Sequence, residues 1–106
     1  MRIALLGALL LAAPLPAAAQ VPGPREGDYI ARNFTFTTGE TLPELRLHYT
    51  ALGQPVKDAA GVTRNAVLIM HGTTGSGRGF LSANFAGQLF GPGRLLDTTK
   101  YFVILP

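Results

Sequence analysis

A glycine-rich segment contains the residues of this sequence that are best placed to do chemistry. Residues 71–79 read HGTTGSGRG and directly follow an apolar run. Glycine permits a tight turn and lets the backbone come close to a ligand. Backbone N–H groups held at such a turn can be aimed at negative charge, either on a phosphate or developing in an acyl-transfer reaction. The segment therefore indicates an anion-stabilising loop.

Nucleotide binding is one alternative for this loop. A strand, a glycine-rich turn and a helix in succession can cradle phosphates. However, the loop lacks the Gly-Lys-Ser/Thr ending of a P-loop, and its glycines do not have the spacing of a dinucleotide fingerprint. The sequence thus favours a reaction in which negative charge develops, and it predicts no cofactor.

Two histidines are the candidates for a general base. His71 ends the apolar run without a Ser or Asp partner at a motif spacing, which favours a structural hydrogen-bonding role. His48 lies in an alternating segment and is interpreted as a polar-face residue. No pair of histidines, and no histidine with carboxylates at ligand spacing, supports a metal site. Because the chain has no cysteine, a thiolate nucleophile is excluded as well.

Two alternating segments are predicted to form a hairpin beside the loop. Within residues 29–38 the segment FTFT (34–37) alternates aromatic with polar side chains, and residues 45–52 alternate again, which is typical of strands with one covered face. Residues 39–44 between them, with Gly39 and Pro43, are predicted to be the turn. The sequence therefore predicts two antiparallel strands at the edge of a sheet.

Two continuous apolar runs are predicted to be strands covered on both faces. They span residues 66–70 and 101–105. Between them Leu81, Phe85 and Leu89 recur at helical spacing. Strand, glycine loop, helix and strand make a βαβ unit with parallel strands and a right-handed crossover. For most of the six phenylalanines this spacing favours core packing over an acyl pocket: Phe34, Phe36, Phe80, Phe85, Phe90 and Phe102.

The N-terminus is predicted to be a secretory signal peptide over residues 1–19. Arg2 gives a positive start, an apolar run follows, and small residues precede the expected cleavage after Ala19. The run is much shorter than the ~20 residues that span a bilayer. Residues 20–28 are rich in Pro and Gly and are predicted to be a surface leader before a domain over residues 29–106. We therefore expect a periplasmic or secreted protein that leaves the membrane after cleavage.

The charge is small for a chain that binds nucleic acid. Nine Lys and Arg stand against six Asp and Glu, for a net charge of +3. The basic residues are scattered rather than clustered, so no stripe for nucleic acid or a membrane surface is predicted. The chain is also short for the fold that its pattern implies.

The order of these segments resembles the opening of the α/β-hydrolase fold. Residues 39–49 (GETLPELRLHY), 65–76 (NAVLIMHGTTGS), 91–93 (GPG) and 97–104 (DTTKYFVI) look like the homoserine O-acetyltransferase branch of that superfamily. The resemblance implies an α/β fold of which this chain forms the N-terminal part. That part is an antiparallel hairpin edge followed by parallel strands with a crossover helix, incomplete before the nucleophile elbow.

The resemblance also implies a role for the glycine loop. In the superfamily the residue after the strand-end His-Gly pair donates its backbone N–H to the oxyanion, and here that residue is Thr73. Gly72 and Thr74 beside it become candidate substrate-binding residues. No Gly-x-Ser-x-Gly elbow is present, since Ser76 lacks the flanking glycines. The nucleophile, acid and catalytic histidine would lie beyond Pro106, so the chain alone is expected to be inactive.

Several functions remain open for such a chain. The leading one is the N-terminal part of an exported serine-type hydrolase that acts on small esters or amides. Hydrolysis is preferred to acetyl transfer because acetyl-CoA and free homoserine are cytoplasmic metabolites. The alternatives are a homoserine O-acetyltransferase-like fragment, a truncated remnant without function, and a small binding module. In the family's strand order residues 66–70 would form an exposed edge, which is an aggregation site.

Overall fold

The structure is a computed structural model that describes residues 23–106. The predicted signal peptide and the first part of the predicted leader lie outside this range. The elements in chain order are β1 (Arg25–Thr35), β2 (Thr41–Leu52), β3 (Ala66–Leu68), the 3₁₀ helix η1 (Gly77–Leu81), α1 (Ala86–Leu89) and β4 (Phe102–Leu105). None of the helices in the described range has the length and apolar character of a membrane span.

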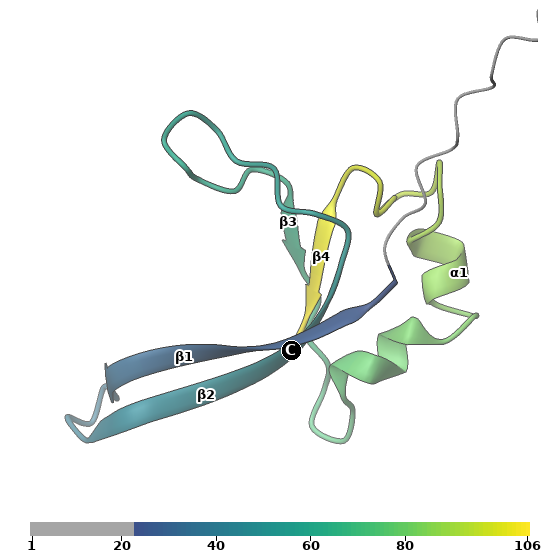
Figure 1. Cartoon of the computed structure of the whole chain (residues 1–106). Coiled ribbons are helices and arrows are strands. Elements are labelled where there is room, and N and C mark those ends of the chain that lie inside the picture. Colours follow the sequence, from purple (N-terminus) through teal and green to yellow (C-terminus); the bar gives the residue numbers. More distant parts are fainter. Residues whose placement is uncertain (1–22) are drawn as a thin grey trace, which may run out of the picture.

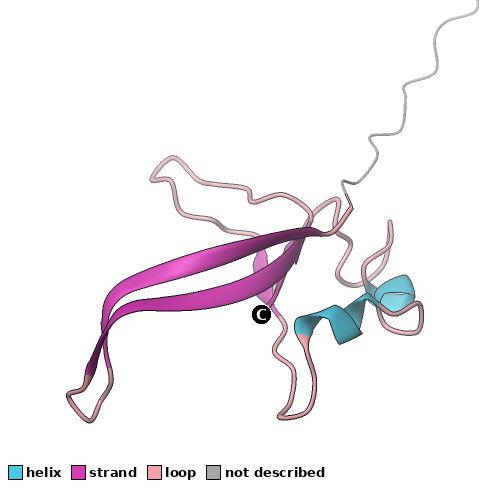
Figure 2. Ribbon diagram, turned by 60° about the horizontal axis from the view of Figure 1, so that its bottom comes forward, coloured by secondary structure: helices cyan, strands magenta, loops and turns pink. Residues whose placement is uncertain are grey.

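β1 and β2 form a long hairpin that projects from the rest of the fold (Figures 1 and 2). Residues equidistant in sequence from Thr38 pair along it. Gly39, at φ 94°, donates its N–H to the Phe36 carbonyl at 2.9 Å and closes the turn. That left-handed conformation favours glycine. The two predicted antiparallel strands at a sheet edge are confirmed.

The start of the hairpin differs from the prediction. β1 begins at Arg25, so the predicted leader is wrong over residues 25–28, which are strand. Gly27 is accommodated there because the Tyr49 ring lies against it from the opposite strand, only 2.8 Å from where a Cβ would stand. Cross-strand cover by an aromatic ring compensates for the missing side chain.

The turn also lies earlier than predicted. Residues 36–40 form it, and Pro43 stands inside β2 rather than in a loop. This part of β2 has β1 on one side only. A proline is tolerated at such a position because no second ladder needs its N–H.

β4 lies between β2 and β3, giving the strand order β1-β2-β4-β3. It runs antiparallel to β2 and parallel to β3, which confirms the predicted parallel pair. β3 is the edge strand, also as predicted. The expectation that residues 66–70 are covered on both faces is wrong for this chain, because Leu68 is 59% and Met70 71% exposed.

The predicted continuous helix is wrong. The segment is divided into η1 and the single turn α1, and Ser82 between them is extended at φ −60° and ψ 150°. Serine competes for backbone hydrogen bonds in a helix interior, and Gly79 and Gly87 disfavour helix further. The local sequence therefore does not sustain the helical periodicity.

A small core forms where these helical pieces pack on one face of β4. Val103 and Leu105 are fully covered, and Phe90 is buried beside them. The Phe85 ring lies between those of Phe80 and Phe90, at centroid distances of 4.7 and 5.8 Å. Core packing is thus confirmed for three of the phenylalanines. The others are exposed or half-buried: Phe34, Phe36 and Phe102.

A polar turn leads the chain into β4. The Asp97 carboxylate accepts the Thr99 hydroxyl at 2.7 Å and the backbone N–H groups of Gly93 and Thr99 at 2.7 and 2.9 Å. These donors, the Thr99 hydroxyl first, hold the pKa of Asp97 below its usual value. Gly53 packs on the same turn, and a Cβ there would lie 2.1 Å from the Tyr101 carbonyl oxygen.

Candidate functional site

The glycine loop leaves β3 through a tight turn. Gly75 donates its N–H to the Gly72 carbonyl at 3.0 Å, which makes Thr73 and Thr74 the two central residues of a four-residue turn. All four residues are exposed. No hydrogen bond within residues 23–106 engages the Thr73 N–H. That amide is therefore accessible to an oxygen of a ligand.

Gly77 fixes the far end of the loop against β4. A Cβ at this position would lie 2.6 Å from the carbonyl oxygens of both Leu105 and Pro106. The loop backbone therefore rests directly on the end of β4. Gly79, in the same helix η1, has nothing within 4 Å of its hypothetical Cβ. Only the first of these two glycines is required by a close backbone contact.

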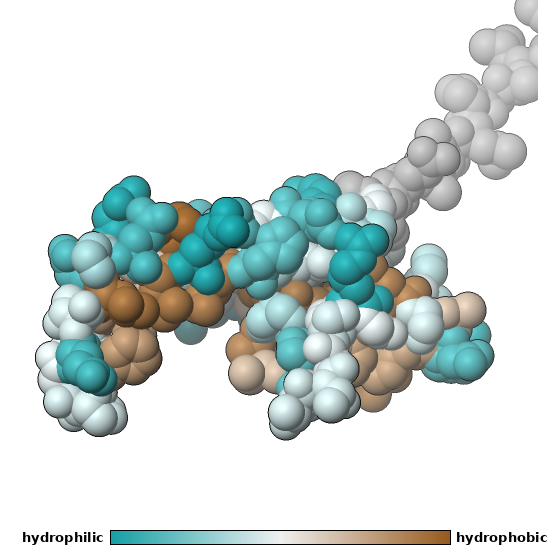
Figure 3. Space-filling view, turned by 90° about the horizontal axis from the view of Figure 1, so that it is seen from below, coloured by the Kyte–Doolittle hydropathy of each residue, from teal (hydrophilic) through white to brown (hydrophobic). Residues whose placement is uncertain are grey.

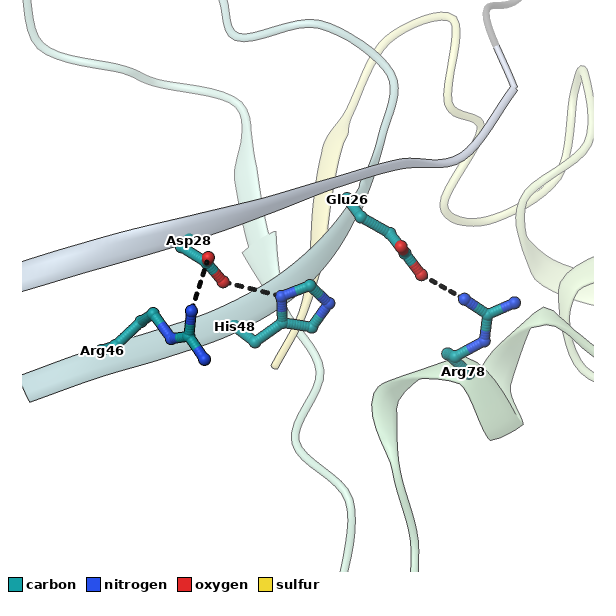
Figure 4. Close-up of polar contacts among 5 residues, drawn as sticks. All are labelled: Glu26, Asp28, Arg46, His48 and Arg78. Carbon is teal, nitrogen blue, oxygen red and sulfur yellow. Dashed lines mark hydrogen bonds and ion pairs between the residues drawn. The ribbon is translucent and has the colours of Figure 1, made fainter.

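An ion pair connects the same end of the loop to β1 (Figure 4). The Arg78 guanidinium donates to the Glu26 carboxylate. The two side chains are 71% and 48% exposed, so the pair contributes about 0–1 kcal/mol. Its role is to join η1 to the base of the hairpin rather than to stabilise the fold strongly.

His71 lies at the start of the loop and contacts its backbone. Its Nδ1 is 2.7 Å from the Gly72 carbonyl oxygen, which accepts a hydrogen bond from the ring when Nδ1 carries the proton. The predicted hydrogen-bonding role is confirmed. Within the described chain, no hydrogen bond joins this ring to a hydroxyl or a carboxylate.

A polar cluster on the hairpin was not singled out in the sequence. His48 Nδ1 lies 2.7 Å from one Asp28 oxygen, and Arg46 lies 3.7 Å from the other (Figure 4). Asp–His pairs serve as acid and base in many hydrolases. Here the His48 side chain is 61% exposed, and no hydrogen bond within residues 23–106 joins it to a hydroxyl. The predicted polar-face role of His48 is confirmed.

The cross-strand register of the hairpin is the feature from which the Asp28–His48 contact could have been predicted. Asp28 and His48 are equidistant from Thr38, so they face each other once the centre of the turn is known. The predicted turn at residues 39–44 shifts every cross-strand pair. A turn centred before Gly39 would have predicted the contact.

The structure places the three predicted loop residues, Gly72, Thr73 and Thr74, in one turn, as their adjacency requires. Ser76 precedes η1 with extended backbone angles of φ −148° and ψ 158°, and does not stand at an elbow between a strand and a helix. Residues 23–106 contain no group of three His, Asp or Glu able to hold a metal ion.

Comparison with known proteins gives partial matches to homoserine O-acetyltransferases. The chain is 34% identical over 105 residues to the one from Thermobifida fusca, covering 88% of the chain and 27% of that protein. It is 38% identical over 81 residues to the one from Natronomonas pharaonis, covering 67% and 19%. The chain thus spans between a fifth and about a quarter of the length of these curated relatives. No protein-family profile matches it.

Two crystal structures show the same partial likeness. Homoserine O-acetyltransferase from Bacillus anthracis aligns with a TM-score of 0.56 at 23% identity, over 77% of this chain and 22% of that one. A mutant esterase aligns with a TM-score of 0.57 at 23% identity, over 76% and 23%. The four-stranded mixed sheet with its short helix therefore matches part of the α/β-hydrolase fold. The resemblance predicted from the sequence is confirmed as a partial match.

Proposed function

We propose that this chain is the N-terminal part of an exported serine-type α/β hydrolase and supplies the Thr73 backbone N–H to its oxyanion hole. The observation that carries the proposal is the exposed turn after β3, in which the Thr73 amide has no partner among residues 23–106. Gly72 and Thr74 flank that amide and would contact the acyl group of the substrate. The substrate class is a small ester or amide.

The geometry suits stabilisation of a tetrahedral intermediate. The turn is closed by its own hydrogen bond, and Gly77 rests on the end of β4, so the amide is held without a substrate. A donor fixed in advance does not need to reorganise when the carbonyl oxygen becomes negative. Loss of one such donor typically costs about 2.7–4 kcal/mol of transition-state stabilisation.

The chain alone would not turn over substrate. An oxyanion hole stabilises charge only after a nucleophile has attacked the carbonyl carbon. Residues 23–106 hold no serine at an elbow and no Asp–His pair hydrogen-bonded to a hydroxyl. In the protein that we propose, the nucleophile, acid and base lie beyond Pro106, and we propose no cofactor.

Hydrolysis is our preferred reaction because of the expected location. The N-terminal sequence predicts export to the periplasm or beyond, where water is the abundant acyl acceptor. Acetyl transfer to homoserine is the second candidate. The relatives from Thermobifida fusca and Natronomonas pharaonis, both named homoserine O-acetyltransferase, favour it.

The role of the Thr73 amide can be tested in a full-length protein that carries this sequence. Thr73→Pro removes the N–H, and proline is favoured at the second position of a four-residue turn, so the turn should persist. We expect kcat for ester hydrolysis to fall by about 10²–10³. Thr73→Ala keeps the amide and serves as the control. Equal kcat in the two variants would exclude Thr73 from the oxyanion hole.

The choice of reaction needs a separate assay. The same full-length protein is offered a short-chain p-nitrophenyl ester, and in parallel acetyl-CoA with homoserine. We expect release of nitrophenol without O-acetylhomoserine. Acetyl transfer without esterase activity would leave the Thr73 role intact and replace hydrolysis by the second candidate.

A further inference from the structure

The peptide group that joins Gly72 to Thr73 carries hydrogen bonds on its carbonyl side. The Gly72 oxygen accepts the Gly75 N–H at 3.0 Å. It also lies 2.7 Å from His71 Nδ1, and the ring is the donor of this contact because a carbonyl oxygen can only accept. The two donors together use both lone pairs of the oxygen. The other end of the same peptide group is the Thr73 N–H, the donor of the proposed oxyanion hole.

Hydrogen bonds at the carbonyl restrain the direction of that N–H. The peptide bonds of residues 23–106 are trans, and in a trans peptide the C=O and N–H lie in one plane and point to opposite sides. A peptide plane that two donors hold at its oxygen is less free to rotate, so the N–H on its far side is held as well. Bonds to the carbonyl also polarise the peptide group, which strengthens its N–H as a donor.

Side-chain packing gives the loop little other support. Apolar residues gather in bands along the hairpin and toward the helices (Figure 3), whereas residues 71–79 include no large apolar side chain. Within these nine residues Gly77 is buried and the rest are exposed. The conformation of the turn therefore depends on its hydrogen bonds and on the contact of Gly77 with β4.

Gly75 leaves room for the His71 side chain beside the turn. A Cβ at residue 75 would lie 3.1 Å from the His71 Cβ and 3.5 Å from its Cγ. The side chain thus lies against the backbone of the same turn whose carbonyl it binds. Within residues 23–106 the ring makes no hydrogen bond to a hydroxyl or a carboxylate. Its contacts are therefore those of a group that orients the backbone.

We propose that His71 is a positioning residue of the oxyanion hole. Its Nδ1–H and the Gly75 N–H together fix and polarise the Gly72–Thr73 peptide group. The Thr73 N–H then meets the developing negative charge without rearrangement. The inference rests on the proposed role of the Thr73 amide and adds the side chain that holds this amide in place. His71 itself does not touch the reacting atoms and transfers no proton.

The test compares two variants of similar shape in a full-length protein that carries this sequence. His71→Asn places an amide nitrogen as far along the side chain as Nδ1, so a donor remains, whereas His71→Leu has a methyl group there. We expect kcat for ester hydrolysis to fall about three- to tenfold in His71→Leu, less than in Thr73→Pro, and to stay close to the parent value in His71→Asn. KM should be unchanged in both, because the oxyanion forms only in the transition state.

A second readout follows the Thr73 amide directly. In the same protein labelled with ¹⁵N-threonine, Thr73→Ala identifies the Thr73 signal by its loss. The ¹⁵N shift of that signal should move in His71→Leu and stay near the parent value in His71→Asn. Both variants lack the imidazole ring, so the difference between them reports the hydrogen-bond donor.

The outcomes separate this inference from the function on which it rests. Equal kcat in His71→Leu and His71→Asn, or a Thr73 signal that moves equally in both, would overturn the positioning role. If Thr73→Pro lowers kcat and His71→Leu does not, the oxyanion role stands and the positioning role alone fails. Equal kcat in Thr73→Pro and Thr73→Ala would overturn both.

Discussion

Two glycines of η1 lie two residues apart, yet only one is tied to the sheet. Gly77 rests on the carbonyl oxygens of Leu105 and Pro106, whereas Gly79 meets open space. The sequence showed a glycine-rich loop, and the resemblance to the α/β-hydrolase superfamily singled out Thr73 within it. The sequence did not show which glycine is sterically required, because the contacting carbonyls lie on β4, far along the chain.

Gly77→Ala should lower the free energy of unfolding by about 1–3 kcal/mol, because its Cβ would overlap backbone that cannot move aside easily. Gly79→Ala is the control and should be neutral or slightly stabilising. The midpoint of urea unfolding, measured for both variants under identical conditions, checks the difference. Equal midpoints would mean that the loop does not rest on β4.

Asp97 should make stability sensitive to acid. Its pKa is lowered below the usual 3.8 by the Thr99 hydroxyl first, then by backbone N–H donors and nearby Lys100. A lowered pKa means that the stabilisation is fully present above pH 3.8 and is lost as the pH falls through the folded-state value. Urea midpoints measured at descending pH should therefore fall less steeply in Asp97→Asn than in the parent.

Among the elements, the strands were predicted better than the helix. Alternation and apolar runs identified all four strands because these patterns report which faces are covered. The helix was wrong because Leu81, Phe85 and Leu89 contact the core without a continuous helix between them. The spacing of these apolar residues reflects that they pack in the core. The extended backbone at Ser82 interrupts the helix but leaves the residues packed.

The junction of β2 with the turn before β4 gives a prediction at this scale. Gly53 and Gly61 have φ of +74° and +79°, so an added Cβ strains both backbones alike. Only at Gly53 would that Cβ also meet backbone, 2.1 Å from the Tyr101 oxygen. Gly53→Ala should therefore cost about 1–3 kcal/mol more than Gly61→Ala, measured by urea unfolding. Similar costs would show that the two segments are not in close contact.

At the scale of the whole molecule, the chain has little core for its surface. Among residues 23–106 the buried apolar residues are Ala51, Phe90, Val103 and Leu105, while large side chains such as Leu68 and Met70 stand in solvent. Continuous apolar runs predicted these strands correctly. They did not predict how far each strand is buried, because an apolar run does not identify the elements that pack on it.

We therefore expect weak thermal cooperativity and poor solubility for this chain alone. Few buried contacts hold the hairpin to the helical end, so the parts should unfold over a wide temperature range. Differential scanning calorimetry at low protein concentration measures the width of the transition. A sharp and reversible transition in a monomer would contradict the expectation.

The intact mass of the native exported protein, taken from its source, is the most direct test of the claim that this sequence is part of an exported hydrolase. We predict a protein that begins at Gln20 and is several times heavier than residues 20–106, with a Ser elbow, an acid and a histidine in the additional sequence. A mass equal to that of Gln20–Pro106 would contradict the claim and leave a remnant or a small binding module.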